Sequence, residues 1–272
     1  DLWMSMAYFI EQQVDYCIIE AGMGGRLDAT TALDYKACLI TNVGLDHTEY
    51  LGDTFEQIAY EKSGVFKPNV PALTTEDKPE CQKVMELVAD YMKTPLCFID
   101  CQETDVLRWN GMTFHLNPPL YQAKNVSLAL ETLNVLGIWL EENEIQQVID
   151  HFQWAGRYMV LRKDPLVLLD GAHNVHGITA LIQSLKDFTG KIYFSVLKEK
   201  DAPHMIELLQ SISKDITLVE ISSARLYPLE ELGYPIITVD ELISRLLDTK
   251  EDSLLCGSLY YVGEVLEKWG NV

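Results

Sequence analysis

Hydrophobic positions in the first half of the chain gather in short, nearly continuous runs. Such runs cover residues 14–19, 37–43 and 96–99, and the first is rich in β-branched side chains and ends at a glycine-rich turn. Runs of this length, separated by helical patterns, are typical of strands buried on both faces of a parallel sheet. The first half is therefore predicted to form an α/β sheet that contains these three strands.

A helix is predicted between residues 47 and 64 because its ends carry clear signals. Thr54 and Gln57 have the spacing of a capping box, Gly64 is placed to cap the carboxyl end, and Pro68 follows. Farther along, Asn110-Gly111 between apolar flanks predicts a hairpin. The hairpin covers 106–116, and two further helices are expected over 125–140 and 144–152.

Strand and helix patterns alternate regularly from residue 158 to the end. This βαβ repetition predicts a second doubly wound sheet. We therefore expect an α/β fold of two doubly wound domains, 1–157 and 158–272, with the boundary near Gly156-Arg157. The predicted strands are 166–169, 192–196, 217–221, 236–239 and 253–256, and the predicted helices are 176–188, 202–212, 240–247 and 261–269.

The composition fits a two-domain protein that does not bind nucleic acid. With 48% hydrophobic residues in 272, the chain can bury more than one core. No run approaches the length of a membrane-spanning helix, and the first residues lack the features of a signal peptide. The net charge of −20 disfavours binding to nucleic acids and to anionic membranes. An anionic substrate would need local cations, helix N-termini or metal ions.

The cysteines and the first residue add two expectations. The six cysteines form no C-x-x-C pair and no zinc pattern, so we expect reduced, structural thiols in a reducing compartment such as the cytoplasm. The chain begins with Asp1, and its apolar residues start at once. A natural protein rarely begins in the middle of an element, so we expect that a preceding segment is missing.

Two polar residues stand where predicted strands end. Glu20 follows the run 14–19 and precedes Gly22, Gly24 and Gly25, while His47 follows the run 37–43. Ligands of α/β sheets bind outside the carboxyl ends of strands, where a carboxylate suits Mg²⁺ near phosphate. Taken singly, Glu20 is better explained as a solvated acid in a turn, and His47 as an exposed loop residue or a helix cap. Their matching positions favour a shared metal site.

Lys62 lies on the apolar face of the predicted helix. Phe55, Ile58, Ala59 and Lys62 share one face by their spacing. A buried lysine is costly unless it is neutralised or paired. The amine either extends to the rim of the core or is made functional by modification or by contact with phosphate.

Asp170 and Arg157 are the candidates in the second half. Asp170 follows the predicted strand 166–169 and opens into a helix, which places it at the carboxyl edge of the second sheet. Arg157 stands at the predicted boundary, where it could hold a phosphate through two hydrogen bonds or form a surface ion pair. Neither residue decides between function and structure by itself.

Seven segments together resemble the signatures of folylpolyglutamate and dihydrofolate synthases, a branch of the Mur ligase family. They follow one another in the family's order and at its spacing, and the resemblance runs from about residue 14 to the end. The segments are 20–30, 40–47, 58–64, 121–125, 154–157, 170–174 and 257–260.

The resemblance implies an ATP-dependent ligase that joins L-glutamate to a carboxylate of a folate or dihydropteroate through an acyl phosphate. The cofactors would be ATP and two Mg²⁺ ions. The partners would be small molecules only, and the protein would be a cytoplasmic monomer. Glu20 and His47 match the family's Mg²⁺ ligands, and Lys62 matches a lysine whose carbamate serves the second Mg²⁺.

The resemblance also implies roles for residues outside the metal site. The pterin-bearing substrate would touch Leu27, Asp28 and Ala29. The ATP contacts would be Asn125, Arg157 and Asp170, with His173 near the transferred phosphate and Ser258 and Tyr260 near a cleft between the domains. The candidate catalytic residues are Lys62, Asp170 and His173.

One departure from the family bears on activity. The family's phosphate-binding pattern G-x-x-G-K-[ST] does not occur in the 272 residues and would be expected before Asp1. Smaller departures are Thr31 for asparagine and Val175 for proline. We expect the chain alone to be inactive. The alternative is a non-catalytic remnant that binds nucleotide or folate. A Mur ligase of cell-wall synthesis is disfavoured by residues 26–30.

Overall fold

The computed structural model describes residues 1–102, 104–117, 119–185 and 187–270. The chain forms two compact units. Unit 1 comprises residues 1–113 and 123–142, and unit 2 comprises 114–122 and 143–272. The predicted boundary near Gly156 falls inside unit 2, and the division of the chain into family domains stays a prediction.

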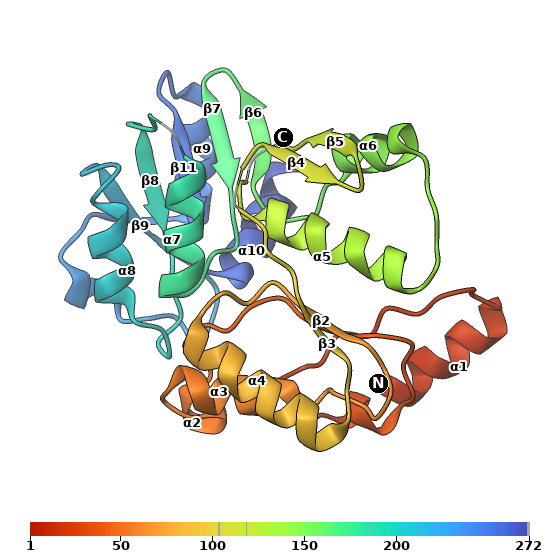
Figure 1. The fold of residues 1–272 in the computed structure, drawn as a ribbon. Helices are drawn as coiled ribbons and strands as arrows, with labels where there is room; N and C mark the ends of the chain where they lie inside the picture. The colour runs from red at the N-terminus through yellow and green to blue at the C-terminus, as the bar shows by residue number, and fades with distance from the viewer. Residues whose placement is uncertain (103, 118, 186, 271–272) are drawn as a thin grey trace. The chain divides into compact units, whose positions relative to one another are not determined.

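Unit 1 is built on a three-stranded parallel sheet. Its strands are β1 (Cys38–Ile40), β2 (Ala72–Thr74) and β3 (Leu96–Phe98), in the order β1-β2-β3. Helices α3 (Phe55–Ser63) and α4 (Pro79–Met92) lie side by side (Figure 1) and form a core with the sheet. The runs 37–43 and 96–99 are confirmed as shorter strands, whereas β2 and α4 were not predicted.

The predicted helix before Gly64 is confirmed, but it is two helices. A short α2 (Thr48–Leu51) ends at Gly52, and α3 then begins after Thr54. The Thr54 side chain accepts a hydrogen bond from the Gln57 backbone N–H, and the Gln57 side chain accepts one from the Thr54 N–H, so the capping box is complete. Gly64 caps the carboxyl end as expected.

The predicted strand 14–19 is wrong. The chain begins with helix α1 (Leu2–Gln12) and continues through residues 14–20 without regular structure, and the side chain of Ile18 is 95% exposed. An apolar run forms a buried strand only if a neighbouring strand pairs with it. Among the described residues β1 pairs with β2 alone, so the run has no ladder to join.

The segment between the two sheets follows the prediction. Strands β4 (Val106–Trp109) and β5 (Met112–His115) form a two-stranded sheet, and Asn110 and Gly111 between them both have positive φ, 46° and 81°. Two positive φ angles are what a two-residue hairpin turn of the primed type requires. Helices α5 (Gln122–Val135) and α6 (Glu142–His151) follow, and α5 lies three to five residues before its predicted range of 125–140.

Unit 2 contains a six-stranded sheet in the order β10-β9-β8-β11-β7-β6. The strands from β10 to β7 are parallel, and the edge strand β6 pairs antiparallel with β7. The predicted strands are confirmed within one or two residues, and β6 was not predicted. They are β6 (Met159–Lys163), β7 (Leu166–Leu169), β8 (Lys191–Phe194), β9 (Ile216–Glu220), β10 (Ile236–Thr238) and β11 (Ser253–Cys256).

Helices cover both faces of this sheet, which confirms the doubly wound arrangement. Leu168 and Leu254 face one core cluster with α7 and α8, whereas Leu169 and Leu255 face another with α9 and α10. The four helices are α7 (Val175–Ser184), α8 (Ala202–Leu209), α9 (Val239–Asp248) and α10 (Leu259–Trp269). Within the described ranges, none of the helices has both the length and the apolar character needed to cross a bilayer.

Candidate functional site

The glycine-rich loop after Glu20 packs its backbone directly on α3. A Cβ atom on Gly25 would lie 2.8 Å from the carbonyl oxygen of Lys62, and one on Gly64 would lie 2.2 Å from Cα of Arg26. The Arg26 side chain donates hydrogen bonds of 2.9 and 2.8 Å to Glu61 Oε1. The loop and the carboxyl end of α3 are therefore one packed structure, and side chains at these glycines would force them apart.

Asp28 holds the same loop together from within. Its Oδ2 accepts hydrogen bonds from the backbone N–H groups of Gly22 and Met23, at 2.9 and 3.2 Å. Its Oδ1 accepts from the N–H and hydroxyl of Thr30, at 2.9 and 2.6 Å. The Thr30 hydrogen bonds are the main reason that the pKa of Asp28 lies below its ordinary value. Both carboxylate oxygens are thus engaged within the loop.

The neighbours of Asp28 differ in exposure. Leu27 is 80% exposed, and Ala29 begins the 3₁₀ helix η1 (Ala29–Ala32) with Asp28 as its N-cap. An apolar side chain this exposed is available to a ligand, whereas the Asp28 carboxylate shapes the turn that presents it. The contact of Leu27, Asp28 and Ala29 with a folate stays a prediction.

The Lys62 amine lies half-buried among carboxylates. Burial lowers the pKa of Lys62, and the negative charges of Asp46, Glu20 and Glu76 act in the opposite direction. Glu20 belongs to the loop before η1, and Asp46 belongs to the loop after β1. The structure therefore brings Glu20 and Lys62, far apart in the chain, into one electrostatic environment.

His47 follows Asp46 and is exposed. Its backbone has φ 52° and ψ 37° and forms the N-cap of α2. In the part of the chain that the structure describes, no three His, Cys, Asp or Glu side chains gather in a way that could hold a metal ion. A metal site at Lys62 would need a ligand of another type, and the carbamate that the resemblance assigns to Lys62 has that chemistry.

Asp170 is the buried acid of unit 2, only 2% exposed at the carboxyl end of β7. Its carboxylate accepts hydrogen bonds of 2.7 Å from the backbone N–H groups of Tyr158 and Ala172. Burial raises the pKa of Asp170, and these hydrogen bonds together with Arg157 and His173 oppose the rise. The sequence placed Asp170 at this edge of the sheet correctly.

Arg157, His173 and Tyr121 surround this carboxylate. His173 is half-buried, with Nδ1 2.8 Å from the carbonyl oxygen of Gly171, and Arg157 is exposed. Tyr121 was not predicted as a neighbour of Asp170. Burial raises the pKa of Tyr121, the Asp170 charge adds to the rise, and Arg157 opposes it. Tyr121 opens the signature segment 121–125, but nothing in the sequence placed it beside Asp170.

Two further candidates have structural roles in unit 2. Ser258 is buried and caps α10 by accepting a hydrogen bond from the Tyr260 N–H. Tyr260 is exposed, and the guanidinium of Arg225 lies 5.7 Å from the centre of its ring. Neither observation tests their expected place near a ligand.

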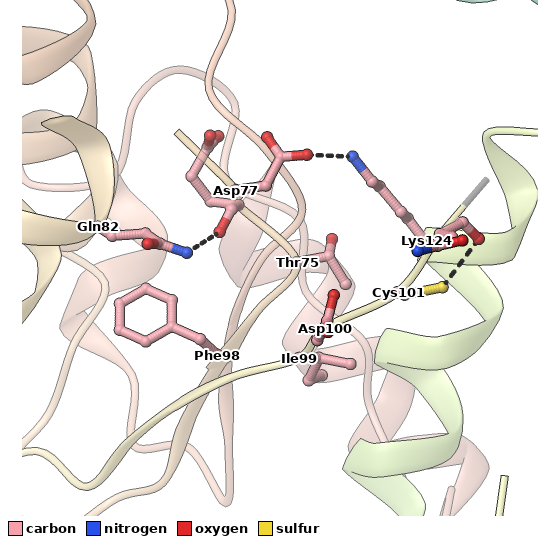
Figure 2. Close-up of a pocket in the computed structure, with 10 residues that line it drawn as sticks. Thr75, Asp77, Gln82, Phe98, Ile99, Asp100, Cys101 and Lys124 are labelled. Carbon is pink, nitrogen blue, oxygen red and sulfur yellow. Dashed lines mark hydrogen bonds and ion pairs between the residues drawn. The ribbon is translucent and has the colours of Figure 1, made fainter. Parts of the chain in front are cut away.

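A cavity of about 530 Å³ opens in unit 1 at the carboxyl ends of β2 and β3 (Figure 2). Lys124 closes one side through a 2.8 Å ion pair with Asp77, and this partner lowers the pKa of Asp77.

Asn125, an expected ATP contact, is the next residue after Lys124 and is exposed. Asn125 belongs to unit 1, whereas Arg157 and Asp170 belong to unit 2. Their joint contact with ATP stays a prediction.

Comparisons with known proteins agree with the sequence segments. The family model for the Mur ligase middle domain matches residues 1–117. The dihydrofolate synthase/folylpolyglutamate synthase of Bacillus subtilis (strain 168) is 28% identical over 298 residues, which cover 96% of this chain and 69% of that protein. The protein of the same name from Buchnera aphidicola subsp. Schizaphis graminum is 33% identical over 217 residues, 74% of this chain and 51% of that protein.

Solved structures share the fold over nearly the whole chain. The Yersinia pestis bifunctional folylpolyglutamate synthase/dihydrofolate synthase, solved with AMPPNP and an Mn ion, has a TM-score of 0.86 and 26% identity, covering 98% of this chain and 69% of that one. Escherichia coli FolC in complex with DHPP and ADP has a TM-score of 0.82 and 29% identity, covering 97% and 68%. Residues 1–117 thus match the Mur ligase middle domain, and nearly the whole chain is similar in sequence and fold to folylpolyglutamate and dihydrofolate synthases.

Proposed function

We propose that this chain is the larger part of an ATP-dependent ligase that adds L-glutamate to a folate or dihydropteroate carboxylate. The relatives that it matches over most of their length carry the names of such synthases. The observation that supports the proposal is that the charges of Glu20 and Asp46, in loops that the family's motifs occupy, both act on the half-buried Lys62.

The proposed metal ligands of unit 1 are Glu20, His47 and Lys62, the last through a carbamate. Burial favours the neutral amine of Lys62, and only a neutral amine can combine with carbon dioxide. The resulting carbamate would carry a negative charge in place of a positive one. Mg²⁺, when bound, neutralises charge that develops on the transferred phosphate. In a chain of net charge −20 this neutralisation has to be local.

The proposed nucleotide contacts of unit 2 centre on Asp170. Its carboxylate is held at a fixed position by the N–H groups of Tyr158 and Ala172. A rigid acceptor suits hydrogen bonds from a sugar hydroxyl, and Arg157 offers a cation to a phosphate. His173, fixed by its hydrogen bond to the carbonyl of Gly171, is the proposed neighbour of the transferred phosphate.

The proposed reaction has two steps. The substrate carboxylate takes the terminal phosphate of ATP to give an acyl phosphate, and the amine of L-glutamate then displaces phosphate to form the amide. Such transfers depend mainly on positioning and on stabilising developing charge. The groups described above are of the right chemical types for both tasks.

Binding and turnover test the proposal separately. We expect ATP with Mg²⁺, or dihydropteroate, to bind the 272-residue chain, and Asp170→Ala to weaken nucleotide binding about tenfold or more. We expect no glutamate incorporation, because the chain contains no G-x-x-G-K-[ST] pattern to hold the phosphates. Normal turnover would overturn the expected inactivity. A chain that binds neither nucleotide nor pteroate would overturn the function.

A further inference from the structure

The loop that carries Asp46 and His47 is tied to the next strand by side chains. The backbone ladder between β1 and β2 ends at the pair Ile40 and Thr74. Beyond that pair, the Thr75 hydroxyl donates a hydrogen bond of 2.7 Å to the carbonyl oxygen of Thr41. Side chains of the segment after β2 therefore continue the connection where the ladder stops.

Val43 is held on both sides of its backbone. Its N–H donates a hydrogen bond to Glu76 Oε2, and its carbonyl oxygen accepts one of 3.0 Å from Lys78 Nζ. Glu76 Oε1 in turn accepts hydrogen bonds from the Lys78 backbone N–H, at 2.8 Å, and from Lys78 Nζ, at 3.2 Å. We call this set of bonds the Glu76–Lys78 clamp.

The clamp places a charge where charge is costly. The Glu76 side chain is fully buried, and Val43 is 0% exposed. Burying a carboxylate costs several kcal/mol unless it is paired and hydrogen-bonded, and a backbone ladder would tie two strands together without one. Glu76 must therefore do something that an ordinary strand extension would not, such as fixing an irregular loop at a defined position.

The position of Glu76 relates the clamp to the proposed site. Asp46 and His47 follow Val43 by three and four positions, and the charges of both Asp46 and Glu76 act on Lys62. The Lys78 ammonium also lies 5.4 Å from the ring centre of Phe55, at the start of the helix that bears Lys62. The clamp thus connects the loop after β1, the end of β2 and helix α3.

We propose that Glu76 and Lys78 are positioning residues that fix the loop 43–47 against α3, so that Asp46 and His47 stand at Lys62. This inference rests on the proposed function for the purpose of the loop, but the clamp itself is independent of it. Glu76 is not among the proposed ligands of metal, nucleotide or folate. Its hydrogen bond acts through the backbone of Val43, and its charge also acts on Lys62.

Hydrogen exchange of the full 272-residue chain tests the clamp directly. In Glu76→Ala we expect the amides of residues 43–47 to exchange about tenfold faster or more, because a charge-assisted bond is lost. Glu76→Gln should restore part of the protection, since its amide oxygen can still accept from Val43 while its NH2 group cannot accept from Lys78. Glu80→Gln, which removes an exposed acid from the first turn of α4, is the matched control and should change nothing.

Lys78→Met provides a second variant should Glu76→Ala unfold unit 1. It leaves the Glu76 bond to Val43 in place and should speed exchange at residues 44–47 while the amides of α4 keep their protection. Unchanged exchange at residues 43–47 in Glu76→Ala, or in Lys78→Met where the first variant unfolds, would overturn the clamp.

The metal readout separates this inference from the proposed function. We expect Mn²⁺ affinity, measured by water-proton relaxation, to fall about tenfold in Glu76→Ala and to recover in part in Glu76→Gln. Faster loop exchange with unchanged Mn²⁺ affinity would leave a structural clamp and overturn its role at the metal site. A wild-type chain that binds no Mn²⁺ would count against the proposed function, and the clamp would then stand or fall on exchange alone.

Discussion

The backbone N–H of Tyr158 donates a 2.7 Å hydrogen bond to Oδ2 of Asp170, which joins the start of the edge strand β6 to the carboxyl end of β7. The same carboxylate accepts the N–H of Ala172 on its other oxygen. Asp170 therefore organises its own sheet edge as well as offering an acceptor to a ligand.

Asp170→Ala should destabilise unit 2 by about 2 to 3 kcal/mol, because two backbone N–H groups lose a buried, charged acceptor. Denaturant unfolding monitored by tryptophan fluorescence measures the change. The exposed acid Glu207 in α8 supplies a control, and Glu207→Ala should shift the midpoint little. Equal midpoints for the two variants would contradict the account of Asp170.

The raised pKa of Asp170 determines the direction in which the stability of the protein should change with pH. The folded state holds this proton more tightly than the unfolded chain does, so the carboxyl contributes stability fully below its ordinary pKa. That contribution is lost as the pH rises through the folded pKa. The stability of wild type relative to Asp170→Asn should therefore decline as the pH rises above about 4. A difference that grows with pH in this range would contradict the sign.

Gly64→Ala should destabilise unit 1 by about 3 kcal/mol, the upper end of the cost of overpacking. The new Cβ would meet the backbone of Arg26 at 2.2 Å, and backbone cannot move aside as a side-chain end can. Gly263→Ala in α10 is the matched control, because a Cβ there meets nothing within 4 Å and alanine favours helix. Thermal unfolding should move down for the first variant and slightly up for the second.

Asp28→Ala should loosen the loop that presents Leu27. Three backbone N–H groups lose their acceptor, so the amides of Gly22, Met23 and Thr30 should exchange faster by about tenfold. Because the pKa of Asp28 is lowered, its contribution to stability is present above its ordinary pKa and is lost as the pH falls through the folded value. Slow exchange of the three amides in the variant would show that Asp28 does not hold the loop.

Lys62 should form a carbamate more readily than an exposed lysine does. The lowered pKa leaves more of the amine neutral at a given pH above neutrality. With ¹³C-labelled bicarbonate, we expect a carbamate NMR signal that disappears in Lys62→Arg and persists in Lys83→Arg, which alters an exposed lysine of α4. A signal that survives Lys62→Arg would place the modification elsewhere.

The second sheet could be predicted well because its strands are buried on both faces. Residues 166–169 and 254–256 are continuous apolar runs, and the structure buries nearly all of them. The edge strand β6 escaped prediction because it is half-exposed and ends in Arg162 and Lys163. Helix α4 could have been found, since Pro79 stands at its first turn and the buried Cys81, Met85 and Ala89 recur at four-residue spacing.

The first sheet was harder because apolar runs alone do not decide pairing. Residues 14–19 have the composition of a buried strand, yet Ile18 is exposed. Local composition cannot supply the neighbouring strand that such a segment needs. Strand β2 is short. The polar residues 74–77, at its end and directly after it, have the composition of a loop.

The sequence predicted individual residues of the candidate site but not the hydrogen bonds that hold them in place. Lys62 and Asp170 were singled out because a charge lay on an apolar face or at the end of an apolar strand. Glu76 follows β2 in the same way that Glu20 follows an apolar run, so the same rule could have found it had β2 been recognised. The hydrogen bonds of Asp28 within its loop depend on tertiary geometry, and no spacing in the sequence reveals them.

Paramagnetic broadening by Mn²⁺ tests the metal site most directly. With specifically labelled residues in the 272-residue chain and substoichiometric Mn²⁺, the NMR signals of Glu20, His47 and Lys62 should broaden together, before those of other labelled residues. Glu20→Gln should weaken the broadening at His47. Broadening that spares His47 and Lys62, or that spreads evenly over exposed acids, would contradict a common site.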